Sequence, residues 1–147
     1  MREILFRGKR ADNGEWVYGF LWKKKYNTDK LFISCFPDED DNEEVFVIYS
    51  ETVGQYTGLT DKNGTKIFEG DILESPIGRK AVVSFGTYKP WSTKDSDDFE
   101  CWKLTLIANN EYETKLECGL GKHCTEYMKV IGNIHDIPEL LKEREGK

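Results

Sequence analysis

The sequence predicts a mostly β fold: a small barrel, SH3-like or otherwise irregular, with extra hairpins and a short C-terminal helix. Three observations support this prediction. Apolar and aromatic residues alternate with a period of two, the alternating segments are short, and most are bounded by Gly, Asp or Asn. At 147 residues the chain suits one domain over 1–147. A finer division has an N-terminal hairpin lobe over 1–50 and a barrel over 51–135.

The clearest strand is EWVYGFLW over residues 15–22, where Trp16, Tyr18, Phe20 and Trp22 share one face. Apolar residues also occupy its other face, so we expect this strand to be covered on both sides. Later strands are expected in LFISCF (31–36), VFVIYS (45–50), TVGQYTG (52–58), KIF, DILES, KAVVSFG, CWKLTLIA and YMKVIGNIH.

One helix is expected over residues 137–145. Asp136 can cap its first turn, Pro138 suits that turn, and Glu139 stands three residues after the cap. An α+β fold is the alternative, in which NEYETKLE, within residues 108–128, forms a second helix.

Two turn signals lie 50 residues apart in the chain. Each reads aromatic-x-Gly, four residues, Asn-Gly, two residues, then a β-branched and an aromatic residue. Asn-Gly favours a tight hairpin turn, and the earlier glycine allows a bend or a bulge. We interpret these positions as a structural turn signature made of Gly8, Asn13, Gly14, Gly58, Asp61, Asn63, Gly64 and Gly70.

The charge of the chain disfavours nucleic acid as a partner. The net charge is −6 and the pI is about 5.1, whereas phosphate binding relies on Lys and Arg. The densest cationic run, residues 23–25, stands beside Trp22 and Tyr26, which leaves a nucleic-acid-binding barrel as an alternative. The sequence has no apolar run of about 20 residues and no signal-peptide core at MREILFRGKR, so no membrane association and a cytoplasmic location are expected.

Three carboxylates in the central segment could carry chemistry. Asp61, Glu69 and Asp71 could hold a metal ion in a metal-dependent hydrolase. Asp61, however, has an ordinary role in capping a turn, and no histidine stands nearby in the sequence. We therefore expect no enzyme, no catalytic residue, no cofactor and no metal.

The four cysteines form no C-x-x-C pair, and we interpret them as buried reduced thiols. Cys118, His123 and Cys124 are close enough in sequence to suggest a metal site, but structural zinc normally needs four ligands. In a strand, His123 and Cys124 would point to opposite faces, so we expect them not to meet.

The aromatic residues are the better functional lead, because aromatic side chains are favoured at interfaces. The candidate binding residues are Trp22, Lys23, Lys24, Lys25 and Trp91. Edge strands of a small β domain also favour pairing between subunits. We therefore expect a homo-oligomer, with a host or phage protein as a further partner.

Three segments carry a resemblance to a known family. The run VGQYTGLTDKNGTKIFEGDIL resembles the central signature of the YopX family, and ILFRGKRADNGEWVYGFL and IGNIHDIPELL resemble its flanking motifs. The resemblance implies a small accessory protein encoded by a bacteriophage or prophage, without recognised catalytic residues. The leading hypothesis is therefore a non-catalytic β module that binds protein or assembles with itself.

Overall fold

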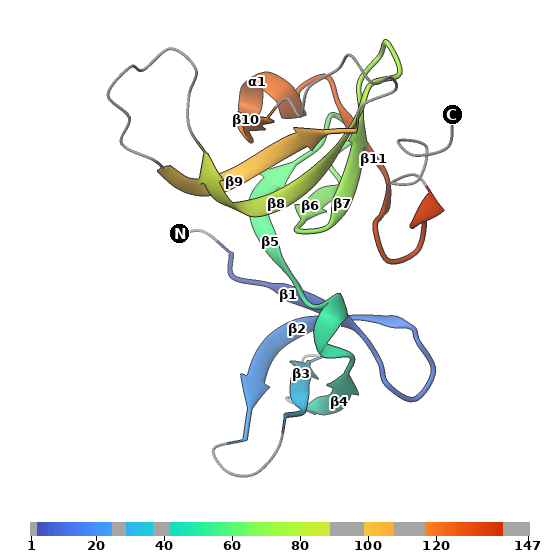
Figure 1. Ribbon diagram of the computed structural model, residues 1–147. Coiled ribbons are helices and arrows are strands. Elements are labelled where there is room, and N and C mark those ends of the chain that lie inside the picture. Colours follow the sequence, from blue (N-terminus) through green and yellow to red (C-terminus); the bar gives the residue numbers. More distant parts are fainter. Residues whose placement is uncertain (1–2, 25–28, 37–41, 89–98, 108–116, 140–147) are drawn as a thin grey trace. The chain divides into compact units, whose positions relative to one another are not determined.

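The computed structural model describes residues 3–24, 29–36, 42–88, 99–107 and 117–139 (Figure 1). The chain divides into two compact units, Met1–Gly58 and Leu59–Lys147. The fold is mostly β, as predicted, with two antiparallel sheets and one short helix. Among the described residues, no helix has the length and apolar character that a membrane span requires.

The first unit is a curled antiparallel sheet in which β1, β2, β3 and β4 are joined in sequence order, and β5 pairs with β1. A single 3-10 turn, Ser50–Thr52, precedes β5. The strands are β1 (Phe6–Lys9), β2 (Trp16–Lys23), β3 (Leu31–Cys35), β4 (Glu44–Ile48) and β5 (Gly54–Thr60).

The curl of this sheet brings the end of β1 against β4. A bridge joins Arg10 to Ile48, and the Tyr49 N–H donates to the Lys9 carbonyl at 2.9 Å. A Cβ on Gly8 would lie 2.8 Å from Cδ1 of Ile48, so glycine allows this close approach. The concave side thereby buries aliphatic side chains of β3 and β4 within the unit.

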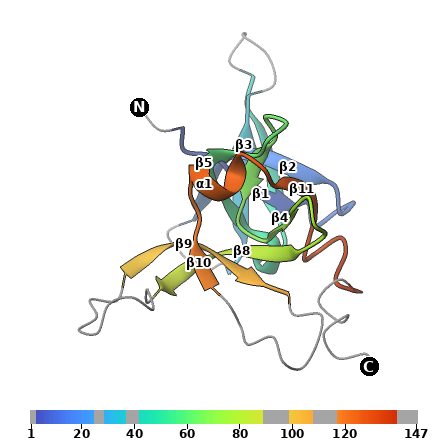
Figure 2. The same ribbon diagram turned by 90° about the horizontal axis from the view of Figure 1, so that it is seen from above.

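The second unit contains a five-stranded antiparallel sheet in the order β10-β9-β8-β7-β11. The long pair β8 and β9 runs side by side in both views (Figure 2). The elements are β6 (Lys66–Phe68), β7 (Asp71–Glu74), β8 (Lys80–Tyr88), β9 (Phe99–Leu106), β10 (Glu117–Gly119), α1 (Lys122–Thr125) and β11 (Lys129–Asn133).

The core of the second unit lies between this sheet and the segment around α1. It contains one cysteine and one methionine among aliphatic side chains, and its members are Ile67, Leu73, Ala81, Val83, Leu104, Cys124 and Met128. The helix α1 contributes Cys124 to this core.

The predicted barrel is not found, because neither sheet closes. In the second unit the edge strands β10 and β11 each pair with a single neighbour, β9 and β7, within the described residues. Closure requires hydrogen-bonded pairing between the two edge strands, and β10 is only three residues long. In the first unit the contact between β1 and β4 is a single bridge rather than a ladder.

The helix predictions have mixed outcomes. α1 lies within residues 108–128, where the α+β alternative placed a helix, but it is one turn long and the fold stays mostly β. The NEYETKLE segment and most of the helix predicted over 137–145 fall outside the described residues.

Candidate functional site

The outer side of β2, β3 and β4 carries a continuous set of exposed apolar side chains. Directly paired residues of an antiparallel sheet point to the same side, and Phe20 pairs with Ser34, which in turn pairs with Val45. The same rule places Trp22 beside Phe32. We call this set the aromatic face; its exposed members are Tyr18, Phe20, Trp22, Phe36, Val45 and Val47, and the half-buried Phe32 lies among them.

One end of the aromatic face is held in a fixed arrangement. The rings of Trp22 and Phe32 are stacked with centroids 4.5 Å apart and an interplanar angle of 16°. The Trp22 indole N–H donates to Ser34 Oγ at 2.8 Å, which fixes the ring plane. Nζ of Lys24 lies 5.6 Å from the Phe32 ring centroid, within range of a cation–π contact. The result is a flat aromatic platform with a cation beside it.

Away from the Trp22 end, the aromatic face is exposed at Phe20 and Phe36. Phe20 is 59% exposed, Phe36 is 49% exposed, and their rings contact edge to face with centroids 6.1 Å apart. The expectation that this strand is covered on both sides was therefore wrong. Ile33 and Ile48 on the other side of the sheet are buried, whereas Phe20, Val45 and Val47 on this side are 59%, 46% and 37% exposed.

The structure brings together some of the predicted binding residues. Trp22 and Lys23 end β2, and Lys24 follows directly, so these three residues lie at one end of the aromatic face. Lys25 and Trp91 lie outside the described residues, as does Tyr26.

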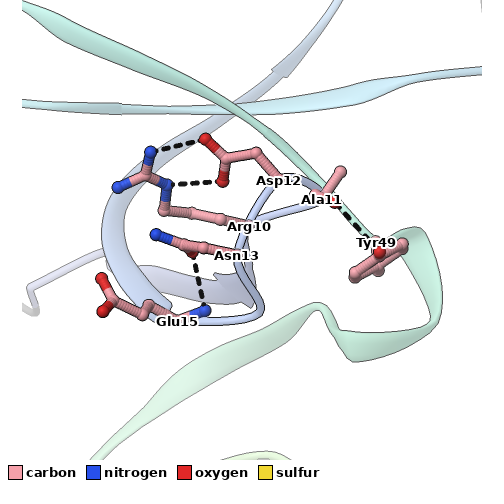
Figure 3. A network of polar contacts seen from close by, with 6 residues as sticks. All are labelled: Arg10, Ala11, Asp12, Asn13, Glu15 and Tyr49. Atoms are coloured by element: carbon pink, nitrogen blue, oxygen red, sulfur yellow. Dashed lines mark hydrogen bonds and ion pairs between the residues drawn. The ribbon is translucent and has the colours of Figure 1, made fainter.

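The first turn of the signature is held by exposed polar contacts (Figure 3). Arg10 donates to both carboxylate oxygens of Asp12, at 2.9 and 2.6 Å, and this hydrogen bonding raises the pKa of Arg10 and lowers that of Asp12. Oδ1 of Asn13 accepts the Glu15 N–H at 2.9 Å. The Tyr49 hydroxyl donates to the Ala11 carbonyl at 3.0 Å and ties the turn to the residue after β4.

The second turn is organised around Asp61, which is 7% exposed. Its Oδ1 accepts the N–H groups of Asn63 and Thr65, at 2.8 and 2.9 Å. Its Oδ2 accepts the N–H of Val130 on β11 at 2.8 Å. Burial raises the pKa of Asp61, but these three hydrogen bonds outweigh it, so the pKa lies below its usual value. Asp61 thus joins the turn to a strand 69 residues away.

The signature glycines have different local roles. Gly14 and Gly64 have φ values of 74° and 83°, as turn positions require, and Gly58 and Gly70 have φ values of 88° and 89°. Gly8 lies within β1, where close packing rather than a positive φ explains it. The internal repeat therefore matches in its Asn-Gly turns and differs at its first glycine.

The carboxylates of the hydrolase hypothesis have separate environments. Asp71 is 2% exposed, and its Oδ2 accepts the Phe68 N–H at 2.7 Å, which is a structural role. Glu69 is half-buried, and burial raises its pKa. Across the part of the chain that is described, no three His, Cys, Asp or Glu side chains converge into a metal site. This arrangement offers no support for the hydrolase.

His123 and Cys124 do meet, so the expectation that they point apart was wrong. They lie in a helix rather than a strand, and His123 Nε2 is 3.7 Å from Cys124 Sγ. The physical reason is that the segment after β10 turns sharply at Gly121 and winds into α1.

Sequence reasoning also missed Asn133, which is buried at the end of β11. Its Oδ1 accepts the N–H groups of His135 and Asp136, at 3.0 and 2.9 Å, while its Nδ2 donates to Asp136 Oδ2 at 2.9 Å. The Asn-x-x-Asp spacing after a strand was the available signal, because Asn favours such local turns.

Comparison with known proteins places the chain in a family. A family model described as YopX protein matches residues 5–142. Among solved structures, the chain is similar to protein EF1440 from Enterococcus faecalis, known from a crystal structure. That likeness has 22% sequence identity and a TM-score of 0.43, and covers 96% of this chain and 99% of the other. Among curated proteins, none matches. The match over residues 5–142 shows that the chain belongs to the YopX family.

Proposed function

We propose that this YopX-family chain is a non-catalytic accessory protein of phage or prophage origin. In this proposal it assembles with a second copy of itself through the aromatic face. The observation that carries the proposal is the exposure of this continuous aromatic and aliphatic face on one side of three strands. The phage setting rests on the family resemblance of its sequence motifs.

The size of the face suits a small specific interface. Its exposed side chains present on the order of 500 Å² of apolar surface, as large as the largest patches on typical monomers. Two such faces packed together would bury on the order of 1,000 Å², near the lower limit for a biological interface.

The charges at the two ends of the face favour a second copy as the occupant. Lys23, Lys24 and Lys30 lie where β2 ends and β3 begins. Glu43 and Glu44 lie at the opposite end, because Glu44 pairs with Cys35 at the far end of β3. A two-fold axis perpendicular to the strands would place the lysine end of each copy over the glutamate end of the other.

The test is light scattering coupled to size exclusion over a concentration series of the full chain. We expect the measured mass to rise from that of one chain toward that of two as the concentration increases. The double substitution Phe20→Ser with Phe36→Ser should keep the mass at that of one chain throughout the series. Both positions are exposed, so the fold should survive. The matched control is Ile77→Ser, 78% exposed in the second unit, which should leave assembly unchanged.

A charge swap makes the test specific to the proposed two-fold arrangement. Lys24→Glu should weaken the dimer because it removes attraction to the acidic end of the other copy, and adding Glu43→Lys should restore it. A monomer at every concentration would refute the proposal, as would a dimer that the double substitution leaves intact.

One observation favours a second candidate function, the binding of single-stranded nucleic acid. The stacked Trp22 and Phe32 with Lys24 beside them resemble the platforms on which bases stack. Fluorescence anisotropy with labelled single-stranded DNA and RNA would test it. Lys23→Glu with Lys24→Glu should abolish an anisotropy change, and unchanged binding would rule out this surface.

A further inference from the structure

A hollow of about 450 Å³ reaches from the surface of the second unit down to its core. Residues of the β7–β8 turn, β8, β9, β10 and the segment after α1 line it. Ala81 and Leu104 in the lining are members of the hydrophobic core and are each 3% exposed. Ile77, also in the lining, is 78% exposed. The core of this unit is therefore not closed over at this place.

The hollow has the size and the lining of a site for a small apolar molecule. Protein interiors are close-packed, with few voids larger than a water molecule, whereas this space would hold about fifteen waters at about 30 Å³ each. Leu106 and Met128 extend the apolar lining formed by Ala81 and Leu104. Ligand pockets typically have volumes of about 300–1,000 Å³ and a largely apolar lining. A molecule of about ten to fifteen non-hydrogen atoms would fit this space.

The turn between β7 and β8 holds one part of the wall in a fixed conformation. The Ser75 N–H donates to the Arg79 carbonyl at 2.8 Å, and the Gly78 N–H donates to the Ser75 carbonyl at 2.9 Å. The Arg79 N–H also donates to Ser75 Oγ at 3.2 Å. Gly78 has a φ of 84°, which suits glycine at such a turn. Ile77 and Arg79 therefore stand on a preformed turn.

Backbone hydrogen bonds also fix the part of the wall that follows α1. The N–H groups of Tyr127 and Met128 both donate to the Cys124 carbonyl, at 3.4 and 3.2 Å. The Met128 carbonyl accepts the Lys62 N–H at 3.1 Å. Because both parts of the wall are held before any molecule enters, binding would require little ordering of the chain.

The charges of the lining leave one cation available to a ligand. Arg79 and Glu117 are the charged residues of the lining within the described part of the chain. Glu117 is already paired, because its Oε1 lies 3.1 Å from Nζ of Lys103. Among the described residues, no ion pair joins the Arg79 guanidinium to a carboxylate. The lining therefore favours an anionic group at Arg79 and disfavours a cationic ligand.

We propose that this hollow binds a small amphipathic carboxylate. Its apolar body lies over Ala81 and Leu104, and its carboxylate pairs with the guanidinium of Arg79. A guanidinium can donate two parallel N–H groups to a carboxylate, which suits this head group. The site lies in the second unit and is independent of the aromatic face, which belongs to the first. Membership of the family assigns no such site.

The volume of the hollow predicts a preference among carboxylates. Acetate has no body to cover the apolar lining, so it gains only the contact with Arg79. A medium-chain carboxylate such as octanoate, with about ten non-hydrogen atoms, fits within the space. For a ligand of this size, we expect a Kd on the order of 100 µM.

The first test is titration calorimetry of the full chain with three probes: octanoate, 1-octanol and acetate. We expect saturable binding of octanoate to one site per chain. Octanol keeps the apolar body but lacks the charge, so it should bind about tenfold more weakly. Acetate should give no saturable heat in the same range. The order of the three probes thus separates the contribution of the lining from that of Arg79.

A photoreactive probe locates the ligand in the chain. The probe is an octanoate analogue that carries a diazirine on its chain, and labelled peptides are identified by mass spectrometry after trypsin digestion. We expect label in the peptides 116–122 and 123–129, which contain Cys118, Tyr127 and Met128 of the lining. Excess octanoate should remove this label. Label confined to peptides of the first unit would overturn the proposal.

Two variants and a control test the roles of the residues. Arg79→Gln should weaken octanoate binding about tenfold and leave octanol binding unchanged, because it removes only the cation. The matched control is Lys129→Gln, which removes an exposed cation of the same unit outside the lining and should change neither. Cys118→Phe, at an exposed position of β10, should fill the hollow and abolish binding of both probes.

Three results would overturn the proposal. The first is an absence of saturable octanoate binding, which would mean that another part of the chain or a second copy fills the hollow. The second is an Arg79→Gln variant that binds octanoate as tightly as the Lys129→Gln control. The third is a folded Cys118→Phe variant, judged by its circular dichroism, that still binds octanoate with the affinity of the wild type.

Discussion

Replacing Asp61 with Asn tests whether the central turn is scaffold. In the native chain Oδ1 accepts two turn N–H groups, and Oδ2 accepts the Val130 N–H of β11. An asparagine can keep its oxygen toward the turn, but its NH₂ group then faces the Val130 N–H, and two donors meet where a bond existed. The perturbation therefore removes the link between the turn and β11 and leaves the turn nearly intact.

The expected loss follows from the bonds broken. A hydrogen bond to a charged group contributes about 1.5–3 kcal/mol, and leaving a buried N–H unpaired adds to this, so Asp61→Asn should destabilise the second unit by about 2–3 kcal/mol. Asp61→Ala removes all three bonds and should cost about 3–4 kcal/mol. For a unit of this size, the smaller loss lowers the melting temperature by about 10 °C or more.

The assay is thermal and urea unfolding of the full chain, followed over pH. Because the folded pKa of Asp61 lies below its unfolded value of about 3.9, the stabilisation is complete above that value and is lost as pH falls through the folded pKa. The stability difference between wild type and Asp61→Asn should therefore be constant near neutral pH and shrink below about pH 4.

The control for this prediction is Glu126→Gln, which removes a carboxylate from an exposed position of the same unit. It should change the melting temperature by less than about 2 °C, since surface substitutions stay within about 0.5 kcal/mol. If Asp61→Asn matched this control, or if its effect stayed constant down to about pH 3, the scaffold assignment of Asp61 would be refuted.

Two further changes test the central segment. Gly64→Ala should destabilise the second unit by about 1 kcal/mol in a urea titration, because φ at this position is 83°. Gly119→Ala is the matched control in the same titration, because a Cβ at Gly119 would meet nothing within 4 Å. Glu69→Gln should stabilise the unit at neutral pH because burial raises the folded pKa of Glu69, so its charged form is disfavoured. That gain should disappear as pH falls below the unfolded pKa of about 4.3, and a pH-independent effect would contradict the assignment.

The sequence predicted the local structure well where the signal was local. Alternating aromatic residues predicted β2, and the structure places that strand at Trp16–Lys23. The Asn-Gly pairs at 13–14 and 63–64 stand at two turns whose glycines have positive φ. Such patterns work because strand alternation and turn dihedrals depend on residues within a few positions of one another.

The candidate site was only partly visible from sequence. Trp22, Lys23 and Lys24 were chosen from their order in the chain, but their neighbour Phe32 comes from another strand and depends on the register between β2 and β3. The Cys124 and His123 contact was missed because a strand was assumed, and residue spacing has a different meaning in a helix.

By itself, the sequence determined the mostly β class, the positions of the main strands and the central turn signature, because these follow from period-two alternation and from the dihedral preferences of Asn and Gly. Only the tertiary structure decided that the sheets stay open, that one side of β2 faces solvent, and that Asp61 binds Val130. These features depend on pairings between residues far apart in the chain. The register of the strands and the curl of the sheet set those pairings, and neither can be read from a local sequence pattern.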